Sequence, residues 1–158
     1  MKSVRRAATP VILTLAALAA APASARDDPA TPEEEIHFRQ SVMVVLGRIR
    51  GDLQAMAKGD VPFDAAAAQK AAALSVALSE LTPRGFGPGT ESGAPTKADA
   101  KIWKEMPKYK AANDKMVAAV AKLPVAAKDK SALKDALGDV GKACKGCHDA
   151  YKLVEYRN

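Results

Sequence analysis

The segment Cys144-Lys145-Gly146-Cys147-His148 lies near the end of a chain of 158 residues and holds its only two cysteines. On a helix, residues three apart point the same way, so both thiols can reach the two vinyl groups on one edge of a porphyrin. The adjacent histidine can then place an imidazole nitrogen on an iron atom beneath the ring. This C-x-x-C-H spacing predicts one covalently attached haem c, with Cys144 and Cys147 as attachment points and His148 as iron ligand.

Three other uses of the two cysteines are weaker. A disulfide between them would close a very short loop and add little stability. A thioredoxin-like redox pair would follow a strand, and no strand pattern precedes Val140. A structural zinc site needs four ligands. Only His37 could join Cys144, Cys147 and His148, and it is more than 100 residues away. Haem attachment is therefore the favoured interpretation.

Outward from this motif, the sequence predicts helices separated by clear breaks. The last helix should start around Asp129 and the third near residues 96–99, with Pro107 dividing the third before it ends at 123–124. Residues 82–95 contain seven glycines and prolines, which predicts a long loop. The inner side of the last helix should carry Leu133, Leu137, Val140, Cys144, Cys147 and Tyr151.

The two earlier helices have recognisable N-terminal caps. Thr31-Pro32-Glu33-Glu34 is a capping box, so a first helix should run from there to about Lys58 and end at Gly59. A second should follow the cap Asp64 and reach about Leu81. No segment alternates as a strand would, so the fold class is all-α, an antiparallel four-helix bundle with covalently bound haem c. The first helix has a stripe of Ile36, Arg39, Met43, Leu46, Arg50 and Leu53.

The N-terminal segment is predicted to be a secretory signal. Basic residues are followed by an apolar run over 11–21 and by Ala23-Ser24-Ala25, so residues 1–25 should be cleaved and 26–158 should form one exported domain. The run is too short to span a membrane, although a retained N-terminal anchor is the alternative. Cleavage lowers the net charge from +6 to +3, and the remaining basic residues are scattered singly, which argues against nucleic-acid binding.

With these features, the sequence resembles the cytochrome c′ family, which are exported four-helix-bundle haem proteins. The resemblance covers nearly all of the chain after the signal. It is densest from Gly138 to Tyr151 and includes Ile102-Trp103. The other matching blocks are Phe38-Arg39-Gln40-Ser41, the run 58–64 and Phe86-Gly87-Pro88-Gly89-Thr90.

The resemblance implies a role for several residues around the haem. Arg39 and Gln40 match positions that meet the haem propionates, which agrees with the need of a buried arginine for an anionic partner. Pairing of Arg39 with Glu35 at the bundle end is the alternative. Lys152 matches a basic residue close to the iron-binding histidine. The sequence departs from the family at Pro83, where many relatives carry an aromatic residue at the haem edge.

Met43 falls where the family places the residue that covers the distal haem face. If Met43 only packs there, the iron is five-coordinate and can bind small diatomic gases such as NO and CO beside electron transfer. If Met43 is the sixth ligand, the protein is a low-spin electron carrier. The loop and first-helix patterns favour the five-coordinate alternative.

The resemblance also implies a location and partners. We expect a periplasmic protein with periplasmic redox partners. A homodimer could form through the first two helices, with Val42, Val45, Ile49 and Met56 as either its interface or bundle core. An enzyme is not expected, because a haem peroxidase needs a distal acid–base group and His37 lies about 240° around the helix from Met43.

Overall fold

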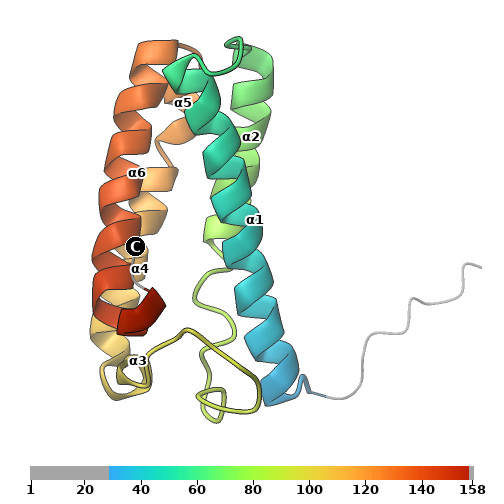
Figure 1. The fold of residues 1–158 in the computed structure, drawn as a ribbon, viewed down its shortest axis with the longest axis vertical. Coiled ribbons are helices and arrows are strands. Elements are labelled where there is room, and N and C mark those ends of the chain that lie inside the picture. The colour runs from blue at the N-terminus through green and yellow to red at the C-terminus, as the bar shows by residue number, and fades with distance from the viewer. Residues whose placement is uncertain (1–28, 157–158) are drawn as a thin grey trace, which may run out of the picture.

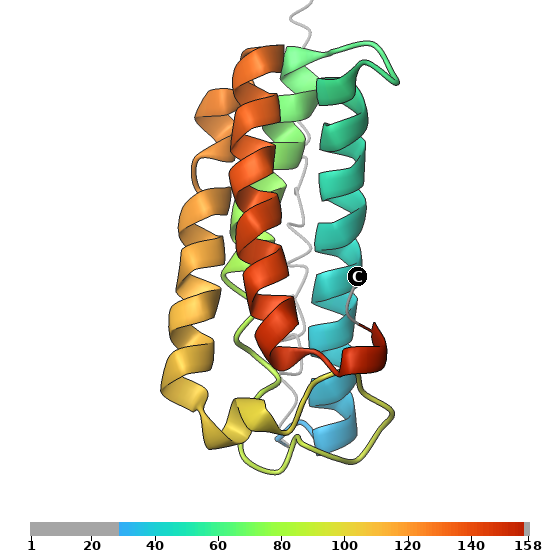
Figure 2. The ribbon, with the colours of Figure 1, turned by 60° about the vertical axis from the view of Figure 1, so that its left-hand side comes forward.

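The computed structural model describes residues 29–156, which form a bundle of four long helices with three short ones (Figure 1). Successive long helices run in opposite directions, so the predicted all-α antiparallel bundle is confirmed (Figures 1 and 2). No helix within residues 29–156 is long and apolar enough to cross a membrane. The predicted signal segment, 1–25, lies outside the described residues. The elements are α1 (Pro32–Lys58), α2 (Ala65–Ser79), α3 (Lys101–Lys104), α4 (Met106–Val120), α5 (Leu123–Ala126), α6 (Lys130–Tyr151) and the 3-10 helix η1 (Val154–Tyr156).

Helix α1 begins and ends where its capping residues predict. The Glu34 backbone N–H donates to the Thr31 hydroxyl over 3.2 Å, and the Glu34 carboxylate accepts from the Thr31 backbone N–H over 2.9 Å. These two bonds satisfy donors that a helix start leaves free. At the other end, Gly59 has a φ of 89°, a left-handed conformation that glycine adopts without strain.

Side-chain caps also start α2 and α6. The Asp64 carboxylate accepts from the backbone N–H groups of Ala66 and Ala67, and Asp129 accepts from that of Ala132. Both starts agree with the prediction. Helix α2 ends at Ser79, slightly before the predicted Leu81, and the chain then continues in turns.

The predicted third helix was wrong at both ends. Residues 96–100 are not helical, because the chain there pairs with the end of α6 and the segment that follows it. The Asp99 N–H donates to the Tyr151 carbonyl and the Leu153 N–H to the Lys97 carbonyl, each over 2.9 Å. Helix α3 starts only at Lys101. Pro107 does divide the region, since it lies in the first turn of α4. Helix α4 ends at Val120, and a separate short helix, α5, then spans the predicted end point.

The core has two parts. An aliphatic cluster joins α1, α2, α4, α5 and α6, and it includes Leu53, Ala68, Ala72, Met116, Leu133 and Leu137. An aromatic cluster lies at the end of the bundle crossed by the long loop and α3 (Figure 2), and it consists of Phe86, Ile102, Tyr109 and Tyr151. Phe86, Tyr109 and Tyr151 therefore lie together at one end of the bundle.

Most of the apolar strip considered for a dimer belongs to the core. Val42 is buried, and Ile49 and Met56 pack against the aliphatic cluster. Val45 is exposed, as is its neighbour Val44. The exposed apolar surface of α1 is thus centred on Val44 and Val45.

Candidate functional site

A cavity of about 560 Å³ lies between α1, the loop with α3 and α4, and the end of α6. Six of the seven predicted site residues line it, which are Arg39, Gln40, Met43, Cys147, His148 and Lys152. The seventh, Cys144, lies one turn earlier on α6 and packs against the aliphatic cluster. The apolar part of the wall includes Val44, Phe86, Ala98, Ile102, Tyr109 and Tyr151. The fold therefore brings residues more than 100 positions apart into one site.

The two cysteines are unpaired and half-buried in a row on α6. Burial raises the pKa of both thiols, and the charge of Arg50 acts in the opposite direction on Cys144. Their spacing on a continuous helix is the one that the C-x-x-C-H motif requires. Both thiols are therefore held in their neutral form beside the cavity.

His148 follows directly and lines the cavity. Its pKa is lowered, first by burial and then by the nearby charge of Lys152, with Asp149 acting in the opposite direction. A lowered pKa keeps the imidazole neutral, which is the form that binds a metal. The charge of Lys152 thus acts on His148, and its expected role beside the iron ligand stays a prediction.

Arg39 forms several hydrogen bonds in the wall of the cavity. Arg39 is 3% exposed, and its guanidinium donates hydrogen bonds to the Gly85 carbonyl, to Thr90 and, over 3.0 Å, to the Thr96 hydroxyl. It also lies 4.7 Å from the centre of the Phe86 ring. Among the described residues it makes no ion pair, so the alternative pairing with Glu35 is wrong. Burial lowers its pKa.

Gln40 lies one residue further along α1 and helps to fix the same loop. Its side-chain amide donates to the Pro95 carbonyl over 2.7 Å. Arg39 and Gln40 therefore both hold the loop wall of the cavity. Whether they also contact haem propionates stays a prediction.

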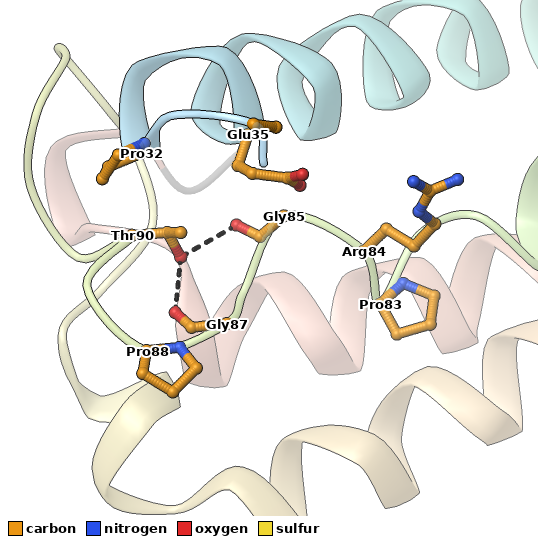
Figure 3. A pocket seen from close by; sticks show the side chains of 9 residues that line it. Pro32, Glu35, Pro83, Arg84, Gly85, Gly87, Pro88 and Thr90 are labelled. Atoms are coloured by element: carbon orange, nitrogen blue, oxygen red, sulfur yellow. Dashed lines mark hydrogen bonds between the residues drawn. The ribbon is translucent and has the colours of Figure 1, made fainter. Parts of the chain in front are cut away.

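The long loop packs closely on α1. Gly85 has a φ of 79°, and a side chain there would come within 2.5 Å of the Glu35 carbonyl oxygen. The Thr90 hydroxyl lies 2.8 Å from the Gly87 carbonyl oxygen and 3.1 Å from that of Gly85 (Figure 3). Only glycine fits such a close approach with a positive φ. The loop is therefore held closely against α1, where it forms one wall of the larger cavity.

A second, smaller cavity of about 390 Å³ lies beside this loop (Figure 3). Pro32, Pro83 and Arg84 belong to its wall, and none of the predicted site residues does. Pro83, where the sequence departs from the family pattern, thus lines this smaller cavity and not the one with the cysteines.

Tyr109 is a cavity residue that the sequence did not single out. Its ring centre lies 4.9 Å from that of Phe86 and 5.6 Å from that of Tyr151, so it links the loop to α6. Trp103 extends the group and donates from its indole N–H to the Gly87 carbonyl over 3.0 Å. Burial raises the pKa of Tyr109. Tyr109, Met116 and Val120 are spaced so that they share one face of a helix, and all three are buried. This spacing could have identified Tyr109 as an inward-facing residue.

The lining fits a haem better than a metal cluster. It contains three cations, Arg39, Lys97 and Lys152, and no carboxylate, which suits a largely apolar group that carries two carboxylates. Within residues 29–156, no three His, Cys, Asp or Glu side chains gather as metal ligands.

The chain is similar to proteins of one known family. A family model described as Cytochrome C′ matches residues 34–152. Cytochrome c′ from Rubrivivax gelatinosus is 44% identical over 123 residues, which are 77% of this chain and 95% of that protein. Its crystal structure has a TM-score of 0.73 with this structure, covering 77% of this chain and 96% of that one.

A second solved structure is a nitric oxide complex of a mutant of cytochrome c prime from Alcaligenes xylosoxidans. It is 35% identical to this chain, with a TM-score of 0.74, and the match covers 80% of this chain and 99% of that one.

Proposed function

Because this chain belongs to the cytochrome c′ family, we propose that it is an exported electron-transfer protein that also binds small diatomic gases such as NO and CO. The family binds one covalent haem c, whose iron supplies one-electron exchange and gas binding. The proposal concerns which residues hold that group and whether one iron site stays open.

We assign the attachment to α6. Cys144 and Cys147 would form the two thioethers, and His148 would bind the iron through its neutral imidazole. Two half-buried thiols at the required spacing, followed by a histidine in the cavity wall, support this assignment. Arg39 and Gln40 would meet the propionates while holding the loop. Burial, together with the charge of Lys152, would lower the pKa of His148 and keep it unprotonated.

The composition of the α1 wall supports an open site for a gas. Apart from Arg39 and Gln40 near the loop, α1 contributes only Met43 and Val44 to the cavity. A thioether and an isopropyl group are neutral and cannot exchange protons. A small neutral gas can bind an iron atom without a charged side chain or a proton donor from the protein. The nitric oxide complex of the Alcaligenes xylosoxidans relative agrees with this proposal.

The same wall argues against a peroxidase. His37, the other histidine of the chain, is exposed and lies 3.6 Å from Glu33 on α1, outside the cavity lining. O–O bond cleavage needs an acid–base group beside the iron. Strong turnover of hydrogen peroxide by the purified holoprotein would overturn the view that this chain is not an enzyme.

Anaerobic titration of the reduced holoprotein with NO and with CO tests the proposal. We expect each gas to change the haem spectrum with a stoichiometry of about one gas per chain. An unchanged spectrum at saturating CO would instead support the low-spin carrier, with Met43 as sixth ligand.

We also propose that residues 26–158 form the mature periplasmic domain and that it exchanges electrons with periplasmic redox partners. The mass of the protein recovered from a periplasmic fraction should correspond to a chain beginning at Arg26. A homodimer would use the exposed part of α1 and α2, where Val44, Val45 and Leu74 are solvent-accessible. Sedimentation of the unmutated protein and of a Val45→Lys variant would test the dimer, which the variant should dissociate, since Val45 is exposed and does not line the cavity.

A further inference from the structure

Arg50 is a second arginine on the inner stripe of α1, and it has an unusual environment. Its Nε atom is buried and has no hydrogen-bond partner among the described residues. One Nη atom lies so close to α6 that a side chain at Gly141 would meet it at 3.1 Å. The guanidinium is therefore pressed against the backbone of α6. A buried donor without a partner destabilises the folded state, so the chain keeps this group at some cost to its stability.

The position of Arg50 relates it to the first cysteine of the motif. Gly141 is three residues before Cys144, so the two lie on the same side of α6. Burial raises the pKa of Cys144, and the positive charge of Arg50 acts in the opposite direction, in agreement with this placement. On α1, Arg50 lies two turns beyond Met43, at nearly the same angle around the helix.

Other charges near this region are placed differently. On α1, Arg48 is 83% exposed and lies 3.6 Å from Asp52. On α6, Lys142 pairs with Asp139 and Lys145 pairs with Asp149, and all four side chains are largely exposed. Water and counter-charges screen these groups. Arg50 has no such ion pair among the described residues, so its charge is less compensated.

We propose that Arg50 is an electrostatic tuning residue, whose fixed positive charge beside Cys144 raises the midpoint potential of the haem. Ferric haem carries one more positive charge than ferrous haem, so a nearby cation favours the ferrous form. Partial burial strengthens the effect because the local dielectric is lower than that of water. This inference rests on the proposed thioether at Cys144.

The test is the midpoint potential of the holoprotein with Arg50→Gln, Arg50→Lys and the control Arg48→Gln. At a fixed electrode potential, Arg50→Gln should raise the ferric-to-ferrous ratio by about threefold or more. Arg50→Lys should remain close to the unmutated protein, because it keeps the charge, and Arg48→Gln should not change the ratio. An unchanged ratio in Arg50→Gln, or an equal shift in Arg48→Gln, would overturn the inference.

Gly141→Leu provides a second test that leaves Arg50 in place. A methyl group alone would meet the guanidinium at 3.1 Å, which a small shift relieves, whereas the larger leucine side chain should displace the guanidinium and lower the potential in the same direction as Arg50→Gln. This variant decides the matter if Arg50→Gln does not fold, and an unchanged potential there would count against the inference. Failure of the proposed attachment is distinguishable, because acid extraction would then release haem from the unmutated protein.

Discussion

The guanidinium of Arg39 on α1 donates a hydrogen bond of 2.8 Å to the backbone carbonyl of Thr90, which is 51 residues further along the chain. The same group bonds to the carbonyl of Gly85 and the hydroxyl of Thr96. One buried side chain thus fixes both ends of the loop that walls the cavity. Arg39 was expected to serve the haem propionates, and it also has this structural role.

Replacement of Arg39 by leucine should therefore destabilise the fold. It would leave buried carbonyl oxygens of the loop without donors, at a cost of about 2–5 kcal/mol in the free energy of unfolding. Urea unfolding of the holoprotein would measure the loss. Arg48→Leu, at an exposed position of the same helix, should change stability by less than about 0.5 kcal/mol. Equal stability of the two variants would mean that the loop bonds of Arg39 contribute little.

The charge of Arg39 can be tested separately from its hydrogen bonds. Arg39→Leu should lower the midpoint potential because a cation near the haem is lost, whereas Arg39→Lys keeps the charge and loses the multiple bonds. Lysine should therefore preserve most of the potential but not the stability. A potential unaffected by either variant, together with intact haem binding, would remove Arg39 from the haem environment.

Covalent attachment at α6 gives a direct chemical prediction. Extraction with acidified organic solvent should leave the haem on the polypeptide, since thioether bonds survive this treatment. The double variant Cys144→Ala with Cys147→Ala should release it, and each single variant should retain one link. Complete release of haem from the unmutated protein would contradict the assignment.

The raised pKa of Tyr109 predicts how stability changes at alkaline pH. Burial raises this pKa above its usual value of 10.0. Above about pH 10 the unfolded chain loses the phenol proton while the folded chain keeps it, so the free energy of unfolding falls as pH rises. Tyr109→Phe should weaken this fall. Unfolding curves at pH 7 and pH 11 would show it, and an equal fall in both proteins would contradict the prediction.

Local features of the sequence were sufficient to predict much of the fold. The Thr31 capping box, the cap Asp64 and the cap Asp129 each act within a few residues, so the starts of three long helices follow from short segments. The stripe on the first helix likewise placed Arg39 and Met43 in one cavity. The C-x-x-C-H motif placed Cys147 and His148 beside them.

Features that depend on distant partners could not be predicted. Residues 97–99 were predicted to be helical, but they pair with residues 151–153 instead. No local sequence pattern indicates this pairing. The loop partners of Arg39 and the unpaired Nε atom of Arg50 likewise depend on how α1 meets other segments. Tyr109 contacts Phe86 of the loop and Tyr151 of α6, which are both distant from it in the sequence.

Met43 should limit the entry of gases without binding the iron. Its flexible side chain lines the cavity and is 37% exposed, so it can move aside when a ligand enters. Met43→Ala should speed the association of CO with the reduced protein, as measured by flash photolysis. Val44→Ala, at the neighbouring and more exposed position, should have a smaller effect. Equal association rates in Met43→Ala and the unmutated protein would show that Met43 is no barrier.

The ferric optical and electron paramagnetic resonance spectra of the unmutated holoprotein at neutral pH test the central claim most directly. If His148 is the only protein ligand and one site stays open, the spectra should be those of high-spin iron, and Met43→Ala should leave them unchanged. A low-spin spectrum with a sulfur-to-iron charge-transfer band, converted to high spin by Met43→Ala, would contradict the account. The protein would then be a six-coordinate electron carrier.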